Sequence, residues 1–248
     1  MDPAKFTTIA HREHRLCNPL DPAVLERVMD GLGLSAGDRV IDMGCGKAAL
    51  LVDLARRFGV TALGVDINAA FLAKGRALAE RHGVATLVTL MNLEASRLEV
   101  EDASVVLALC IGSTHALGGY PDTLRVLARL VRPGGHVLVG QGYWKRVPDA
   151  EYLERLGATV DEMTTHEGNI AAGIAEGLEG AGAWTSGADD WDRYEDLYAD
   201  TVEGYVVGHP EDPDAPAMLE RIRRWRETYR RWGRDTLGFG LYLFRRTR

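Results

Sequence analysis

Residues 40–49 have the sequence Val40-Ile41-Asp42-Met43-Gly44-Cys45-Gly46-Lys47-Ala48-Ala49. Two apolar residues lead into an aspartate and two closely spaced glycines, and an amphipathic pattern then continues to about residue 58. Glycine allows a tight turn and lets a ligand approach the backbone, because no Cβ stands in the way. The pattern therefore predicts a strand, a ligand-binding turn and a helix.

The same alternation of strand and helix continues along the chain. We expect further strands at 61–65, 85–91, 105–110 and 136–140, and helices at about 69–82 and 121–131. Short apolar strands that alternate with amphipathic helices are typical of a mostly parallel sheet with helices on both faces. The predicted fold class is therefore α/β, with a Rossmann-like doubly wound sheet.

The flanking segments are predicted to belong to the same single domain, which spans residues 1–248. Residues 1–35 should form an N-terminal arm and a helix that lie over the active site, with Asp21-Pro22 as a helix start. After residue 149 we expect a short helix, a sixth strand near 159–164, a helical cap insertion at 167–235 and a last strand at 240–244. The cap contains four of the five tryptophans. It should close the pocket, and its aromatic rings would suit an apolar or cationic molecule.

Composition limits the class of protein. A formal net charge of −7 and a pI of about 5.5 argue against a protein built to bind nucleic acid. No apolar run approaches the roughly 20 residues of a membrane span, and the N-terminus has no apolar stretch of signal-peptide type. The three cysteines make no disulfide framework, so we expect a reducing, cytoplasmic location.

One basic segment, residues 218–234, departs from this acidic average. A basic helical face could contact RNA phosphates, but Glu220 and Glu227 are interleaved with the arginines. We favour a solvated or ion-paired helix over an RNA-binding face. The arginines concerned are Arg221, Arg223, Arg224, Arg226, Arg230, Arg231 and Arg234.

The glycine turn has two interpretations. Gly44-x-Gly46-x-x-Ala49 satisfies the dinucleotide fingerprint with alanine at its third position. A dinucleotide brings a pyrophosphate anion, however, and the Asp42 carboxylate would work against it. S-adenosylmethionine (SAM) instead brings an ammonium and a sulfonium, for which Asp42 is a suitable neighbour. Asp66, at the end of the next strand, could accept both hydroxyls of a ribose.

In these features the sequence resembles the class I SAM-dependent methyltransferases, above all bacterial enzymes that act on small molecules. Residues 40–49 resemble motif I of that family, with Asp42, Gly44 and Gly46 in place and Ala48 where a third glycine is usual. Residues 130–135 resemble the turn before its fifth strand. The resemblance covers roughly residues 36–145. It implies a seven-stranded sheet whose last strand is antiparallel, with a helical cap inserted before that strand.

The resemblance also implies SAM as cofactor and assigns residues to it. Asp66 would hold the ribose, and Glu94, with the backbone near Leu93 and Ala95, would contact the adenine amino group. Asn92 is a competitor for the adenine role. The complete set of expected cofactor-binding residues is Asp42, Gly44, Cys45, Gly46, Asp66, Ile67, Leu93, Glu94, Ala95 and Cys110.

The acceptor should lie near the fourth strand, outside the carboxyl ends of the sheet. His115, in a polar loop after that strand, is the preferred general base or orienting residue, with His14 and Tyr143 as further candidates. A base is needed only for a protonated nucleophile of high pKa. No metal is expected. A metalloid site made by the three cysteines matches no spacing signature, and Asp189-Asp190 is the only obvious acidic pair.

The predicted function is therefore SAM-dependent methyl transfer to a small molecule, carried out mainly by positioning. Three alternatives stay open from the sequence: an NAD(P)-dependent oxidoreductase, an RNA methyltransferase that uses the arginine-rich helix, and a non-catalytic SAM-binding module. The sequence leaves open the acceptor, the atom that is methylated and the oligomeric state.

Overall fold

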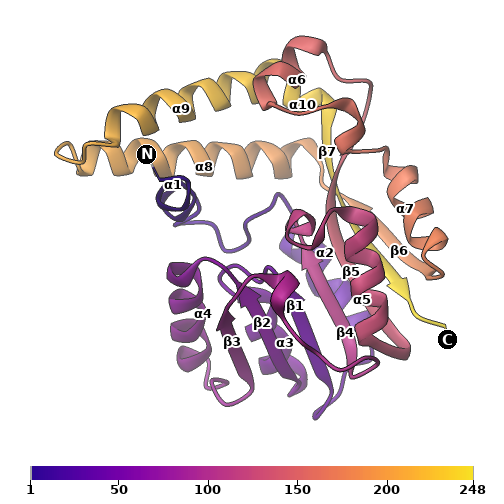
Figure 1. The fold of residues 1–248 in the computed structure, drawn as a ribbon. Coiled ribbons are helices and arrows are strands. Elements are labelled where there is room, and N and C mark those ends of the chain that lie inside the picture. The colour runs from indigo at the N-terminus through magenta and orange to yellow at the C-terminus, as the bar shows by residue number, and fades with distance from the viewer. Residues whose placement is uncertain (1, 248) are drawn as a thin grey trace.

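A seven-stranded sheet with the order β3-β2-β1-β4-β5-β7-β6 organises the computed structural model, which describes residues 2–247 (Figure 1). Strands β1 to β5 are parallel, whereas β7 pairs antiparallel with both β5 and β6. The predicted fold class and the antiparallel last strand are thus confirmed. The strands are β1 (Arg39–Met43), β2 (Thr61–Asp66), β3 (Val88–Asn92), β4 (Val105–Ile111), β5 (Val131–Trp144), β6 (Glu179–Thr185) and β7 (Leu237–Arg245).

Helices cover both faces of the sheet because its strands are apolar on both sides. Val40 of β1 belongs to one buried cluster and the next residue, Ile41, to another. This alternation follows from the two-residue period of a strand. The first cluster packs under α2 (Pro22–Gly31) and α3 (Ala49–Phe58), and the second under α5 (Tyr120–Leu130). Helix α4 (Ala69–Arg81) lies beside α3 and over β3.

The sixth strand is not where the sequence predicts it. Residues 160–162 form a short 3-10 turn after α6 (Ala150–Leu156), and β6 lies within residues 167–235, where the sequence predicts a cap of helices and loops. The sequence of β6, Glu-Gly-Ala-Gly-Ala-Trp-Thr, is glycine-rich, and none of its residues is fully buried. Since β6 is an edge strand, it lacks the apolar alternation that would have revealed it. Helix α7 (His166–Ala175) covers the sheet rather than capping the pocket.

Strand β5 is longer than predicted. The expected turn at residues 132–135 is an irregularity inside the strand, because Val105 pairs with Val131 whereas Leu107 pairs with His136. Gly134 has a φ of +82°, which suits glycine. A bulge of this kind keeps both ends of the segment in the sheet.

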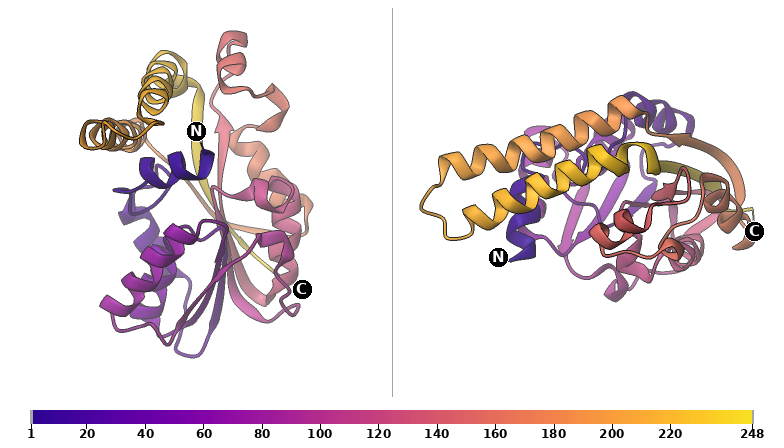
Figure 2. Two further views of the ribbon diagram at one scale, coloured as in Figure 1. Left: turned by 60° about the vertical axis from the view of Figure 1, so that its left-hand side comes forward. Right: turned by 90° about the horizontal axis from the view of Figure 1, so that it is seen from above.

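The N-terminal arm and a long helical hairpin lie beyond the carboxyl ends of the strands (Figures 1 and 2). The arm comprises α1 (Pro3–Ala10) and the irregular residues 11–21, and the hairpin comprises α8 (Ala188–Gly208) and α9 (Ala215–Thr228). Phe6 and Ile9 of α1 pack against Val202, Met218 and Ile222 of the hairpin. The hairpin therefore supports the arm.

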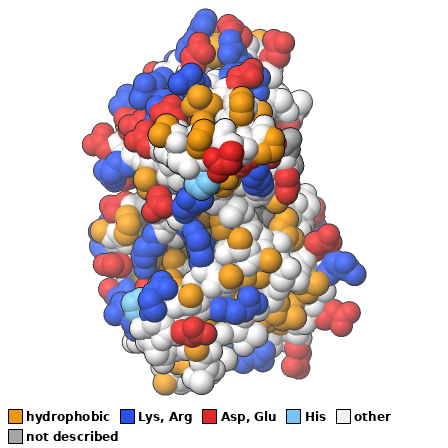
Figure 3. Space-filling model, turned by 90° about the vertical axis from the view of Figure 1, so that its left-hand side faces the viewer, with side chains coloured by type: hydrophobic (Ala, Val, Ile, Leu, Met, Phe, Trp, Pro, Cys, Tyr) orange, Lys and Arg blue, Asp and Glu red, His pale blue; other side chains and the backbone are white. Residues whose placement is uncertain are grey.

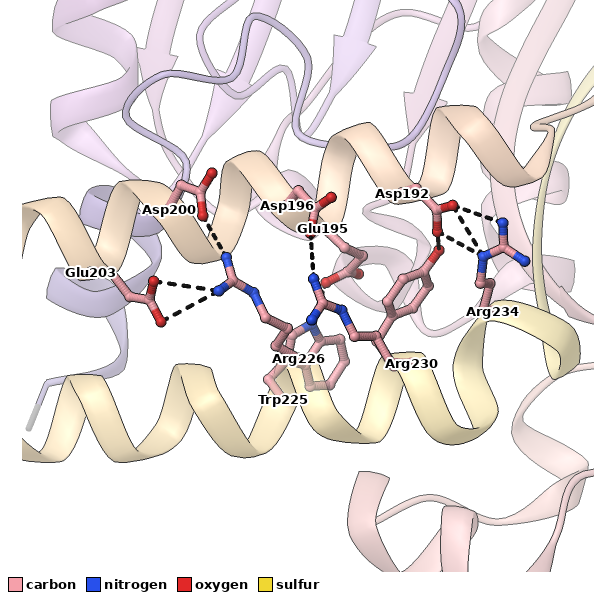
Figure 4. A network of polar contacts seen from close by, with 10 residues as sticks. Asp192, Glu195, Asp196, Asp200, Glu203, Trp225, Arg226, Arg230 and Arg234 are labelled. Atoms are coloured by element: carbon pink, nitrogen blue, oxygen red, sulfur yellow. Dashed lines mark hydrogen bonds and ion pairs between the residues drawn. The ribbon is translucent and has the colours of Figure 1, made fainter.

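Three of the seven arginines within residues 218–234 contact acidic side chains of α8 (Figure 4). Arg226 contacts Asp200 and Glu203, and Arg230 and Arg234 contact Asp196 and Asp192 respectively. Figure 3 shows acidic and basic side chains intermingled on the end face of the hairpin. These contacts agree with the ion-paired helix that we favoured. None of the helices within residues 2–247 is at once long and apolar enough to cross a membrane.

Candidate functional site

A cavity of about 810 Å³ lies between the carboxyl ends of β1 to β4 and the arm. Its floor comes from the glycine turn after β1, the segment after β2 and the loops after β3 and β4. Its roof comes from α1 and residues 15–20 of the arm. A volume of this size falls in the range typical of small-molecule sites.

The glycine turn is held in place by the neighbouring strand. The N–H groups of Gly44 and Cys45 both donate to the carbonyl oxygen of Val65, each at 2.9 Å. Gly44 and Gly46 have φ values of +89° and +54°, so both need the conformational freedom of glycine. A Cβ at Gly44 would lie 2.4 Å from the Cβ of Ser113, and the loop after β4 therefore packs directly on this turn.

Asp66 connects the turn to the next helix. Its Oδ2 accepts a hydrogen bond from the N–H of Gly46 and its Oδ1 accepts one from the N–H of Asn68, both at 2.8 Å. A carboxylate offers about four acceptor positions. Asp66 lines the cavity, so it retains the capacity to accept hydroxyl groups of a bound ribose.

Asp42 is the buried acid of the site. Its side chain is 5% exposed, and Oδ1 has no hydrogen-bond partner among the described residues. Burial, with a smaller contribution from Asp66, raises the pKa of Asp42 to about 7. A buried carboxylate without a partner is costly. A cationic group in the cavity would supply the missing partner, whereas a pyrophosphate would repel it, so this acid fits SAM.

The segments after β2 and β3 form the other end of the cavity. Ile67 is 74% exposed there, and Glu94 also lines the cavity. Asn92 instead donates to the carbonyl oxygens of Asp66 and Ile67 at 3.0 and 2.9 Å. Of the two candidates for the adenine contact, only Glu94 lines the cavity.

Nine of the ten expected cofactor-binding residues line this cavity: Asp42, Gly44, Cys45, Gly46, Asp66, Ile67, Leu93, Glu94 and Ala95. The tenth, Cys110, is fully buried in the second core cluster, on the face of β4 opposite Leu109. The next residue, Ile111, lines the cavity instead. One position along a strand reverses the direction of a side chain, and this explains the difference.

Of the three catalytic candidates, only His115 lines the cavity. It lies on η2 (Thr114–Leu117), which is anchored by a hydrogen bond of 2.7 Å from Thr114 Oγ1 to Gln141 Oε1. Tyr143 does not reach the cavity, since its ring packs near His166, 5.4 Å away between ring centroids.

His14, the third candidate, also lies outside the cavity. Its ring is buried, and Nε2 donates to the carbonyl oxygen of Tyr194 at 3.0 Å. The arm presents His11 to the cavity in its place. The chain is irregular after Ala10, so no helical periodicity indicates which of the two histidine side chains points toward the cavity. The sequence alone therefore does not distinguish His11 from His14.

The hairpin contacts the arm, and the arm forms the roof of the cavity. Within the described residues, the lining of the cavity comes from residues up to Ala116, and none comes from the predicted cap at 167–235. Tyr194 instead donates to the carbonyl oxygen of Cys17 at 3.3 Å, and the ring of Tyr198 lies 4.9 Å from that of His11. The aromatic residues of the hairpin therefore hold the roof in place.

The three cysteines do not form one cluster. Cys17 and Cys45 line the cavity, whereas Cys110 lies in the core. Burial raises the pKa of Cys17 to about 11, which keeps this thiol protonated. Residues 2–247 contain no group of three or more His, Cys, Asp or Glu side chains arranged to hold a metal ion.

Comparison with known proteins points to one family. Residues 40–135 match the family described as methyltransferase domain. The crystal structure of a SAM-dependent methyltransferase from Geobacter sulfurreducens, in complex with S-adenosyl-L-homocysteine, is 30% identical, with a TM-score of 0.90 and coverage of 97% of each chain. The uncharacterized protein YjhP of Escherichia coli is 29% identical over 248 residues, or 98% of each chain. A ubiquinone biosynthesis O-methyltransferase from Aeromonas salmonicida is 30% identical over 165 residues, which cover 62% of this chain and 68% of that protein.

Proposed function

The chain belongs to the SAM-dependent methyltransferase family and takes S-adenosyl-L-methionine as its cofactor, and from this premise we propose that it methylates a small molecule bound beside His115. SAM supplies a methyl group on a sulfonium, which leaves as a neutral thioether. No covalent enzyme intermediate is needed. The contribution of the protein is to position the reactants and to exclude water.

The observation that carries the proposal is the convergence of three carboxylates on one cavity. Asp42 lies near the end of β1, Asp66 ends β2 and Glu94 follows β3, and all three side chains line the same space. We assign Asp66 to the ribose hydroxyls and Glu94, with Leu93, Ala95 and Ile67 around it, to the adenine. Asp42 and the turn at residues 44–46 would hold the charged amino-acid end.

His115 is the proposed acceptor-side residue. It follows β4, next to Ser113, which packs on the glycine turn. An imidazole there could orient an acceptor or remove its proton, and a base is required only when the acceptor arrives protonated. The roof formed by the arm favours a small acceptor over a macromolecule, because it covers the space above the turn.

The alternatives have less support. An NAD(P)-dependent oxidoreductase would place a pyrophosphate against the buried Asp42 carboxylate. An RNA methyltransferase would need the arginines of residues 218–234, and three of these seven, Arg226, Arg230 and Arg234, already pair with acids of α8.

Calorimetric titration with S-adenosyl-L-homocysteine (SAH) tests the cofactor assignments. The wild-type chain should bind SAH, and Asp66→Ala should weaken binding about tenfold or more, in line with the loss of charge-assisted hydrogen bonds. Asp122→Ala, which removes an acid from the exposed side of α5, is the matched control and should leave the affinity unchanged. Equal affinities in all three proteins would refute the ribose assignment.

Transfer of labelled methyl from SAM tests the acceptor class. A bacterial extract is separated by size and each fraction is incubated with the protein and methyl-labelled SAM. Label should enter the small-molecule fraction, and His115→Ala should slow that transfer without changing SAH affinity. Label found only in RNA or protein would contradict the proposal.

A further inference from the structure

His11 is a cavity residue that the proposed chemistry leaves without a role. It is the C-cap residue of α1, and its ring packs among those of Tyr198, His14 and Phe71 at centroid distances of 4.9, 5.4 and 6.4 Å. Its carbonyl oxygen accepts a hydrogen bond of 2.7 Å from Lys47 Nζ. Both the ring and the backbone of His11 are therefore fixed.

The hydrogen bonds around Tyr194 decide which ring nitrogen of His11 carries the proton. The Tyr194 hydroxyl contacts two groups, each at 3.3 Å: the carbonyl oxygen of Cys17 and Nε2 of His11. A carbonyl oxygen only accepts, so the single hydroxyl proton goes to Cys17. Nε2 of His11 must then donate to the hydroxyl oxygen, which leaves Nδ1 unprotonated.

The other tautomer is less favourable. It would leave the Cys17 carbonyl without this donor and would place a buried N–H at Nδ1 without an acceptor, and unpaired buried N–H groups are rare. Burial, with smaller contributions from His14 and Lys47, lowers the pKa of His11 to about 3. The ring is therefore neutral at ordinary pH and presents a lone pair at Nδ1.

That lone pair has no partner within residues 2–247. Nδ1 of His11 is buried and makes no hydrogen bond to the described residues. The side-chain oxygen of Asn18, from the same arm, is a second buried acceptor without a partner, and both residues line the cavity. Unsatisfied buried polar atoms are uncommon and each one calls for an explanation, of which a bound ligand is one.

The neighbours of His11 indicate which part of a ligand it faces. Lys47 directly follows the glycine turn, and Phe71 lies in the first turn of α4, shortly after Asp66. Cys17, six residues further along the arm, places its Sγ 3.9 Å from the position of a Cβ at Gly46. These elements border the part of the cavity that we assign to the ribose and to the charged amino-acid end of SAM, whereas His115 and the acceptor side follow β4.

We propose that His11 is a cofactor-contacting residue, whose unprotonated Nδ1 accepts a hydrogen bond from a hydroxyl or ammonium group of SAM. Tyr194 is the positioning residue that fixes the tautomer of His11. The proposal rests on the proposed function. It implies that the arm binds the cofactor directly, in addition to covering the cavity.

The first test measures SAH affinity by calorimetry in variants of the full chain. His11→Phe keeps a ring of similar size but removes the acceptor, and should raise the Kd for SAH about 3- to 10-fold, the value of one hydrogen bond. His11→Asn restores an oxygen acceptor close to the Nδ1 position and should recover part of the affinity. His14→Phe, next to the cavity but not lining it, should change the Kd less than about twofold.

The second test reads the tautomer directly. Long-range 1H–15N NMR of the histidine side chains should show His11 protonated at Nε2, and addition of SAH should shift the Nδ1 resonance. Tyr194→Phe should populate both tautomers and raise the Kd less than His11→Phe does. Thermal melting of each variant checks that the fold is retained.

Two results would overturn the proposal: a His11 protonated at Nδ1, or wild-type SAH affinity in a folded His11→Phe. Either can occur while the wild-type chain still binds SAH and transfers methyl groups. Absence of SAH binding to the wild-type chain, in contrast, would remove the proposed function itself, so the two failures are distinguishable.

Discussion

Lys47 Nζ donates a hydrogen bond of 2.7 Å to the carbonyl oxygen of His11. Lys47 immediately follows the glycine turn, and His11 ends the first helix of the arm, so this contact joins the floor of the cavity to its roof. Lys47 is only 9% exposed, and burial lowers its pKa. An amine placed in this way is well suited to hold the arm in one position.

Lys47→Met should loosen the arm, since it keeps an unbranched side chain but removes the terminal amine. The loss of a hydrogen bond from a charged donor should raise the Kd for SAH about tenfold. Hydrogen exchange measured by mass spectrometry should become faster in residues 11–20. Lys74→Met is the control, because Lys74 contacts the neighbouring carbonyl of Arg12 from an exposed position at 3.3 Å. Equal effects of the two substitutions would contradict a special role for Lys47.

Gly44→Ala should abolish SAH binding at concentrations that saturate the wild type. Alanine at a φ of +89° is strained, and its Cβ would lie 2.4 Å from that of Ser113. Calorimetry and thermal melting measure the two effects. In the double variant Gly44→Ala/Ser113→Gly, part of the lost stability should return because the steric conflict is gone. Gly31→Ala, where the new Cβ meets nothing within 4 Å, should be neutral or slightly stabilising.

Asp42 should couple SAH binding to pH. Its pKa is raised to about 7 in the free protein, and a ligand ammonium favours the ionised form. As pH falls below 7, binding must therefore first remove a proton, and affinity should drop by up to about tenfold per pH unit. Titrations between pH 5.5 and 7.5 measure this slope. Asp42→Asn should bind more weakly and show no such slope, and a slope that survives in Asp42→Asn would assign the proton to another group.

Glu195 should make the hairpin less stable as pH rises. This carboxyl is 3% exposed and accepts a 2.6 Å hydrogen bond from Trp225 Nε1, and burial raises its pKa to about 7. Because the pKa in the folded protein exceeds the ordinary glutamate pKa of 4.5, the stabilising contribution of Glu195 is complete below pH 4.5 and is lost as pH rises through 7. Glu195→Gln keeps an acceptor for Trp225 and should raise stability at pH 8 by about 3 kcal/mol, with little change at pH 4.

Chemical denaturation at the two pH values measures the effect of Glu195→Gln. Glu203→Gln is the comparison, since Glu203 pairs with Arg226 on the outside of the hairpin and should contribute less than about 1 kcal/mol. A Glu195→Gln variant that is less stable than wild type at pH 8 would show that the ionised carboxylate is well accommodated.

The sequence by itself determined the five parallel strands and the floor of the cavity. The turn at Gly44 and Gly46 needs positive φ values, and this is a local requirement that glycine satisfies wherever it occurs. Asp42, Asp66 and Glu94 could be assigned to one edge because the carboxyl ends of parallel strands lie together. The spacing of apolar residues and the need for glycine in a turn each depend on only a few neighbouring residues. Both features can therefore be identified from the sequence.

Only the tertiary structure decided the roof, the direction of individual side chains and the sixth strand. His11 rather than His14 lines the cavity, and the His14 ring instead donates to the carbonyl oxygen of Tyr194, 180 residues further along the chain. Cys110 faces the core and not the ligand, and β6 joins the sheet without an apolar pattern of its own. Each of these outcomes depends on packing between segments that are distant in sequence. A local sequence pattern does not indicate which distant residue a side chain will contact.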